Sequence, residues 1–150
     1  MELYGPLEFL LVEGEGTFRV LLSKLGRNYV FDAQNRISES DLKTWLFWAE
    51  FDLMPRNRQI RELLANKAHL IDGEKLPPSY EEFLLHYSSW EIAHKRWKEQ
   101  GVAYSWHSNT NWPGEFASDV RNSFSALKRE HAYLLGQLAQ GLQRANYPRR

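Results

Sequence analysis

SYEEFLLHYSSWEIAHKRWKEQGVAYSWHSNTNWP, residues 79–113, is the stretch that says most about the fold. Ser79 and Glu82 have the spacing of a capping box, in which each side chain bonds the other residue's backbone amide at a helix start. Gly101 suits the left-handed position that ends many helices, so a helix is predicted from Ser79 to about Gln100. Its aromatic side chains and one histidine follow a 4-3-4-3 spacing, typical of one seam of a helical bundle: Phe83, Tyr87, Trp90, His94 and Trp97.

A second helical stretch precedes this one. Ser38 is a good N-cap residue, and apolar residues continue after it in helical period until a stop predicted at Asp72-Gly73. Pro55 lies inside the stretch, and proline kinks or ends a helix because it lacks an amide hydrogen and clashes with the preceding turn. Residues 38–71 are therefore predicted to form either one kinked helix or two helices.

The last helix is predicted to start at Trp112-Pro113, because proline is favoured in a first helical turn. Its apolar seam is expected to consist of Phe116, Val120, Phe124, Leu127, His131, Leu134 and Leu138. The basic tail, residues 143–150, is predicted to fray.

The N-terminal element, within residues 1–37, admits two interpretations. Its leucines recur at intervals of three and four residues, which favours a helix, although Gly14 and Gly16 each weaken a helix by about 1 kcal/mol relative to alanine. In the alternative, two short strands flank a turn at residues 13–16, which would make this element partly β. The fold predicted overall is mainly α, an antiparallel bundle of three to five helices with a long kinked helix.

Composition limits the classes of protein to consider. A chain of 150 residues is expected to form one domain, residues 1–150, with residues 38–142 as the bundle. Nineteen basic and nineteen acidic side chains give zero net charge, which argues against a dedicated nucleic-acid-binding protein. There is no cysteine, which excludes disulfides and thiol catalysis and fits the cytoplasm. Neither a secretory signal nor a transmembrane segment is evident.

The loop after the helix of residues 79–100 is the best candidate for a binding surface. Ordered loops that mix aromatic rings with amides and hydroxyls often recognise ligands. The residues expected to bind are Tyr104, Trp106, His107, Asn109, Asn111 and Trp112. In the alternative interpretation, the tryptophans fasten the loop to the bundle and the amides serve local turns.

Histidines and carboxylates supply the candidate chemistry, but no complete catalytic set. Glu91 and His94 have the Glu-x-x-His spacing of di-iron bundles, yet no second copy of that motif exists. His94 is therefore expected to be a hydrogen-bonded core residue, and whether it meets His131 is left open by the sequence. Glu82 and His86, four residues apart, are expected to make a modest surface contact. Arg56, Arg58 and Arg61 are expected on a solvated, charge-balanced face.

The function predicted from these observations is that of a non-enzymatic interaction or regulatory protein, cytoplasmic and self-associating, with the aromatic loop as its binding surface. No cofactor or metal is predicted. The alternative is a metal-assisted hydrolase or another histidine- and carboxylate-dependent enzyme, which would use residues drawn from His86, Glu91, His94, His107 and His131.

Overall fold

The fold is mainly α-helical, as the sequence predicts, in a computed structural model that describes residues 1–71 and 73–146. In chain order the helices are α1 (Tyr4–Leu25), α2 (Glu39–Trp48), α3 (Met54–Asn66), α4 (Pro78–Gln100) and α5 (Phe116–Asn146), with a π-helical turn η1 (Ala49–Leu53) and a 3-10 turn η2 (Ala68–Leu70). None of the described residues forms a strand, so the partly β alternative for the N-terminal element is wrong. None of the described helices is long and apolar enough to cross a membrane.

α1 forms despite its two internal glycines, because leucines on one face are buried in the core. It ends at Gly26, whose φ of 67° is in the left-handed region that glycine tolerates best. Gly14 has a second role, because a Cβ at this position would lie 3.1 Å from the Arg56 side chain. The missing side chain therefore lets α1 and α3 approach closely at this point.

α2, η1 and α3 form one unbroken helical segment from Glu39 to Asn66. Ser38 caps it as predicted, with its hydroxyl oxygen accepting a hydrogen bond from the Asp41 amide. Pro55 does not end the segment, because the wider π-helical turn before it accommodates the missing amide hydrogen. The helix stops at Asn66, earlier than expected, and Asp72 of the predicted stop lies outside the described residues.

The capping box predicted at Ser79 is not formed. Pro77 occupies the cap position of α4 without a side-chain hydrogen bond, and Pro78 is the first helical residue. Ser79 is buried and donates its hydroxyl hydrogen to Asp119 of α5, 2.6 Å away. The predicted end of the helix is correct, with Gly101 in the left-handed region at φ 69°.

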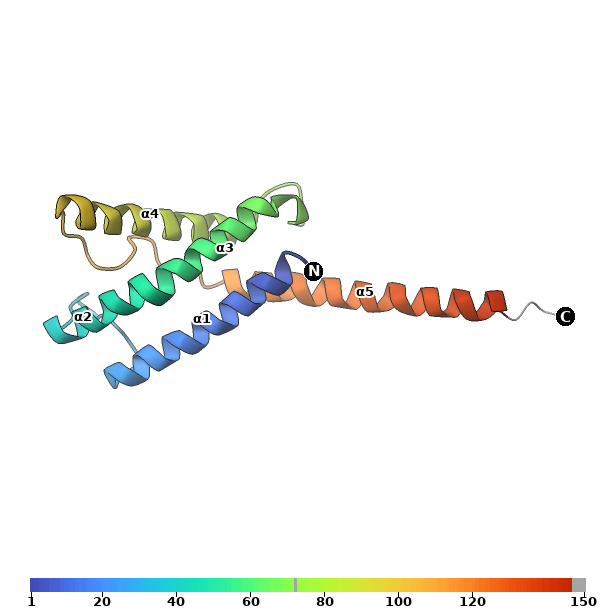
Figure 1. Ribbon diagram of the computed structural model, residues 1–150, viewed down its shortest axis with the longest axis horizontal. Helices are drawn as coiled ribbons and strands as arrows, with labels where there is room; N and C mark the ends of the chain where they lie inside the picture. Colours follow the sequence, from blue (N-terminus) through green and yellow to red (C-terminus); the bar gives the residue numbers. More distant parts are fainter. Residues whose placement is uncertain (72, 147–150) are drawn as a thin grey trace.

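α5 begins at Phe116 rather than at Pro113, and it continues to Asn146, which includes residues 143–146 of the tail predicted to fray. The remainder of the predicted frayed tail, residues 147–150, lies outside the described residues. Figure 1 shows that only the first part of α5 lies against the other helices, while the rest extends far beyond them. Arg121 joins this first part to α1 by ion pairs with Glu8 and Glu15, at 3.2 and 2.8 Å.

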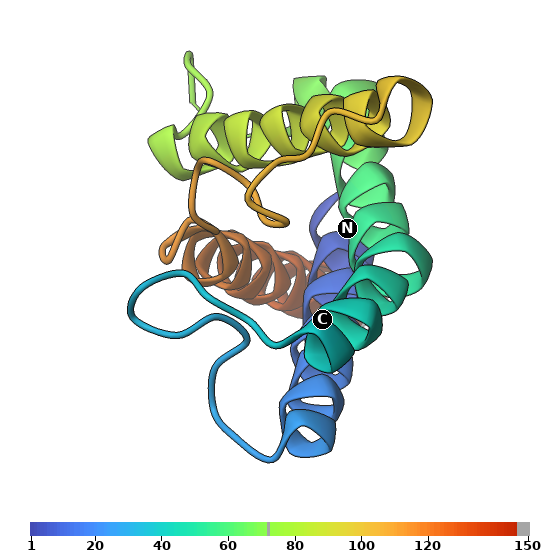
Figure 2. The same cartoon turned by 90° about the vertical axis from the view of Figure 1, so that its left-hand side faces the viewer.

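Two apolar clusters hold the bundle together. One is shared by α1, α3, α4 and the start of α5, and its largest fully buried side chains include Tyr4, Tyr80, Phe83 and Phe116. The other contains Leu21, Val30, Trp45, Ala49 and Trp90, with Tyr104 and Trp106 packed against it. Figure 2 shows the segment between α4 and α5 running between these two helices, which places the predicted binding loop beside both of them.

Candidate functional site

The loop after α4 is fastened to the bundle by the polar atoms of its own aromatic residues. Trp106 has a φ of 68°, a left-handed conformation that strains a residue with a bulky side chain. The indole nitrogen of Trp45 donates to the Trp106 carbonyl at 2.6 Å, and the Trp106 ring meets that of Trp97 edge to face. These contacts with α2 and α4 hold the strained turn in place.

Tyr104 is part of a partly buried hydrogen-bond network with α4 and η1. The Trp90 indole donates to the Tyr104 hydroxyl at 3.3 Å, and this hydroxyl lies 2.7 Å from Nδ1 of His94. Nε2 of His94 lies 2.9 Å from the Glu50 carboxylate. The same carboxylate forms an ion pair with Lys98 at 2.6 Å. Both ring nitrogens of His94 thus have a hydrogen-bond partner, as predicted for a core histidine at position 94.

The centre of the loop is tied to His86 of α4. Nδ1 of His86 lies 2.6 Å from the Thr110 carbonyl, which can only accept, so Nδ1 carries the hydrogen. The Ser108 hydroxyl donates to the His86 carbonyl at 3.0 Å. Burial lowers the pKa of His86, although the hydrogen bond to the Thr110 carbonyl opposes that shift. His86 is therefore held as a neutral imidazole.

The six predicted binding residues do not share one surface. Tyr104 and Trp106 face the bundle, and His107 lies partly buried against Phe31, with its Nε2 buried and unpartnered among the described residues. The remaining three are exposed: Asn109, Asn111 and Trp112. The loop's ability to bind a partner stays a prediction, and only these three of the six residues lie on its outward side.

The histidines and carboxylates of the enzymatic alternative are not gathered into one site. His131 lies on the exposed part of α5, whereas His94 is enclosed by Tyr104 and Glu50, so the two histidines are apart. Glu91 pairs with Arg58 rather than with His94. Within the described ranges, no group of three or more histidines and carboxylates has a geometry that could hold a metal ion.

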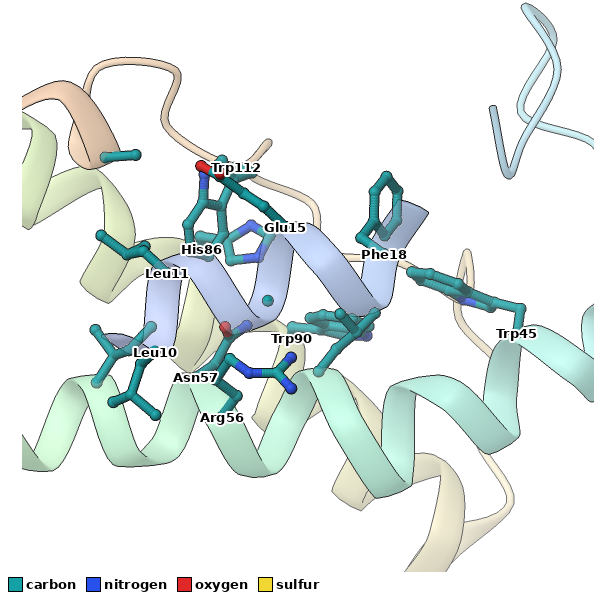
Figure 3. A pocket seen from close by; sticks show the side chains of 14 residues that line it. Leu10, Leu11, Glu15, Phe18, Trp45, Arg56, Asn57, His86, Trp90 and Trp112 are labelled. Atoms are coloured by element: carbon teal, nitrogen blue, oxygen red, sulfur yellow. The ribbon is translucent and has the colours of Figure 1, made fainter. Parts of the chain in front are cut away.

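A cavity of about 400 Å³ lies at the centre of the bundle. It was not predicted from the sequence. Figure 3 shows its side chains converging from α1, α3 and α4. Most of the lining is apolar or aromatic, and the residues are Leu10, Leu11, Gly14, Glu15, Phe18, Trp45, Leu53, Arg56, Asn57, Ile60, His86, Trp90, Trp112 and Ala117. Phe18 and Trp112 are 36% and 41% exposed, so the cavity has an open side.

The charged groups of this lining already have partners within the protein. Arg56 is only 8% exposed and pairs with Asp52 and Glu13, which corrects its predicted place on a solvated face. Glu15 pairs with Arg121. A hydrogen bond from Arg56 to Asp52 raises the pKa of Arg56, so the guanidinium stays charged. The cavity therefore offers an anionic ligand no free cation.

Asn57 differs from its charged neighbours. It is 7% exposed and lines the cavity, and its side chain makes no hydrogen bond to any of the described residues. In Figure 3 its amide points from α3 towards α1, into the cavity. Sequence reasoning missed this residue because it sits in a polar run, although it lies on the same face of α3 as the buried Ile60 and Leu64.

Comparisons of the chain with protein-family models, with curated proteins and with solved structures found no match. A function for the chain therefore has to be inferred from the geometry of its own residues.

Proposed function

We propose that the chain is a non-enzymatic interaction protein that self-associates through the outer part of α5, defined as residues 131–143. The supporting observation is that every residue of this part is exposed, although it carries several large apolar side chains. Their exposed fractions are 65% for Tyr133, 52% for Leu134, 53% for Leu135, 64% for Leu138 and 66% for Leu142.

An uncovered helix of this kind is costly to maintain. Isolated helices shorter than ~12–15 residues are marginal in water, and most helices in proteins are stabilised by packing an apolar face. Burying one leucine side chain contributes about 1.5–3 kcal/mol. Leu134, Leu138 and Leu142 lie on one face because residues three and four apart are neighbours on a helix. Covering this face therefore stabilises the outer part of α5 itself.

A second copy of the same helix is the occupant that the sequence favours. Residues 131–143, HAYLLGQLAQGLQ, contain no Asp, Glu, Lys or Arg, so they offer nothing for a charged partner to complement. The spacing from Leu127 through His131 and Leu134 to Leu138 is the 4-3-4 pattern of a coiled-coil seam. Zero net charge also leaves little long-range repulsion between copies.

The proposal also includes two expectations from the sequence, namely a binding surface on the loop after α4 and a cytoplasmic setting. Asn109, Asn111 and Trp112 supply a second exposed surface, on the bundle itself, for a protein partner. The cysteine-free composition supports a cytoplasmic setting.

Sedimentation velocity over a wide concentration series tests the proposal. We expect the wild-type chain to sediment as a dimer and the double variant Leu134→Glu/Leu138→Glu as a monomer. The matched control is Leu85→Glu/Ile92→Glu on α4, since these side chains are 62% and 63% exposed and lie outside α5. A wild-type chain that stays monomeric at all concentrations would overturn the proposal. So would a control variant that is monomeric to the same extent as the α5 variant.

A further inference from the structure

The central cavity has the size and chemistry of a small-molecule site. Its volume of about 400 Å³ falls within the range of ~300–1,000 Å³ typical of ligand pockets. Such pockets are mostly apolar, with a few polar groups that orient the ligand. Here Trp45, Trp90, Trp112 and Phe18 supply aromatic walls.

Asn57 is the buried polar side chain of the lining that makes no hydrogen bond to the described residues. The described side-chain atoms that are fully buried without a partner belong to Glu8, Trp48 and His107, so the Asn57 amide keeps accessible surface and is open to a ligand in the cavity. Asn57 is more than nine-tenths buried, lines the cavity and has no side-chain partner among the described residues. Because an amide carries both a donor and an acceptor, it can bond a group that also does both.

The paired charges decide what kind of ligand fits. Arg56 pairs with both Asp52 and Glu13, and Arg121 is shared by Glu15 and Glu8, so carboxylates outnumber cations and an anionic ligand would enter without a counter-charge. Burying an unpaired charge is strongly unfavourable. His86 lines the opposite wall, on α4, and meets the rings of Trp90 and Trp112 edge to face, which extends the aromatic surface.

We propose that the cavity binds an uncharged aromatic molecule carrying one hydroxyl or amide group, which Asn57 recognises by hydrogen bonding. The aromatic walls hold the ring system, and the open side beside Phe18 and Trp112 is the entry. This site is independent of self-association, because none of its lining residues belongs to the outer part of α5.

Three related probes test the proposal on the wild-type protein: 2-naphthol, naphthalene and 2-naphthoate. They share a ring system and differ in carrying a hydroxyl, no polar group or a negative charge. Binding is followed by the fluorescence of the tryptophans in the lining and by calorimetry. We expect saturable binding of 2-naphthol, about tenfold tighter than that of naphthalene, because only the hydroxyl satisfies the amide. We expect no saturable binding of 2-naphthoate.

Variants then assign the contact to Asn57. In Asn57→Leu, 2-naphthol should lose its roughly tenfold advantage while naphthalene binds at least as tightly as before. Ala117→Phe, which adds a ring to the lining, should weaken both neutral probes. Leu134→Glu/Leu138→Glu should leave binding unchanged, whatever its oligomeric state.

No saturable binding of the neutral probes to the wild-type protein would overturn the proposal, as would equal binding of 2-naphthoate. Equal binding of 2-naphthol and naphthalene to the wild type would exclude recognition by Asn57, even if Asn57→Leu fails to fold.

Discussion

Arg56 shows how strongly one side chain can depend on residues far away in the sequence. Its neighbours Arg58 and Arg61 suggest a basic surface, yet Arg56 lies under α1, bonded to Asp52 and Glu13. The sequence carries a weak signal of this in Gly14, whose missing side chain makes room for Arg56. That signal is readable only once α1 is known to cross α3 at this point.

Removing the Arg56 charge should therefore destabilise the fold. Arg56→Met leaves the Asp52 carboxylate, whose side chain is 23% exposed, without its cation, and we expect a loss of about 2–4 kcal/mol in the free energy of unfolding. The control Arg58→Met breaks a more exposed pair with Glu91 and should cost less than about 1 kcal/mol. Urea unfolding measures both, and equal losses would contradict the burial of Arg56.

His86 should make stability depend on pH. Because burial lowers the pKa of His86 in the folded chain, the unfolded chain binds a proton more readily, near pH 6.5. The stability that neutral His86 contributes to the fold is thus fully present above about pH 6.5 and is lost as the pH falls below that value. Urea unfolding at pH 7.5 and 5.5 should show a smaller loss for His86→Gln than for the wild type. An identical loss in both proteins would assign the effect to other groups.

Helix starts and ends show what local sequence can and cannot decide. The cap at Ser38 and the end at Gly101 were predicted correctly, because each depends on residues within one turn. Ser79 has an equally good local pattern, yet its hydroxyl bonds Asp119 of α5 instead of a backbone amide. A partner forty residues away cannot be inferred from a four-residue motif.

The two glycines inside α1 should respond differently to the same substitution. Nothing lies within 4 Å of a Cβ placed at Gly16, so Gly16→Ala should raise the free energy of unfolding by up to about 1 kcal/mol. At Gly14 a Cβ would crowd Arg56 at 3.1 Å, so Gly14→Ala should gain less or lose stability. Thermal unfolding compares the two variants, and an equal gain would mean that α1 and α3 are not in close contact there.

At the scale of the whole molecule, α5 is longer than the helix α1 against which it packs. At about 1.5 Å per residue, the 31 residues of α5 span ~46 Å, whereas the 22 residues of α1 span ~33 Å. The predicted seam continues without change from the buried Phe116 and Val120 to the exposed Leu134 and Leu138. The periodicity therefore identified the apolar face of α5, but not the residue beyond which the other helices no longer cover that face. The cavity was not predicted for a similar reason, because its lining residues are far apart in the sequence.

Self-association through an uncharged helix should be nearly insensitive to salt. Raising ionic strength from about 0.1 M to about 1 M shortens the Debye length from ~10 to ~3 Å and weakens exposed ion pairs. We expect the dimer Kd to change by less than about threefold in sedimentation equilibrium over this range. A much larger weakening would place charged residues outside 131–143 at the interface.

The π-helical turn at Ala49–Leu53 also sets the rotational phase of the helix after it. Successive residues of an α-helix are turned by about 100°, whereas π-helical residues, with one more residue in each hydrogen-bonded turn, are turned by less; if all five residues of this turn were α-helical, α3 would be rotated by roughly one residue's step relative to α2. Asn57 and Arg56 would then point away from α1. In evolutionary terms, the wider turn lets the chain carry one additional residue while Asn57 and Arg56 stay beside α1, so we expect a single-codon deletion here to be absorbed by conversion of the turn to α-helix.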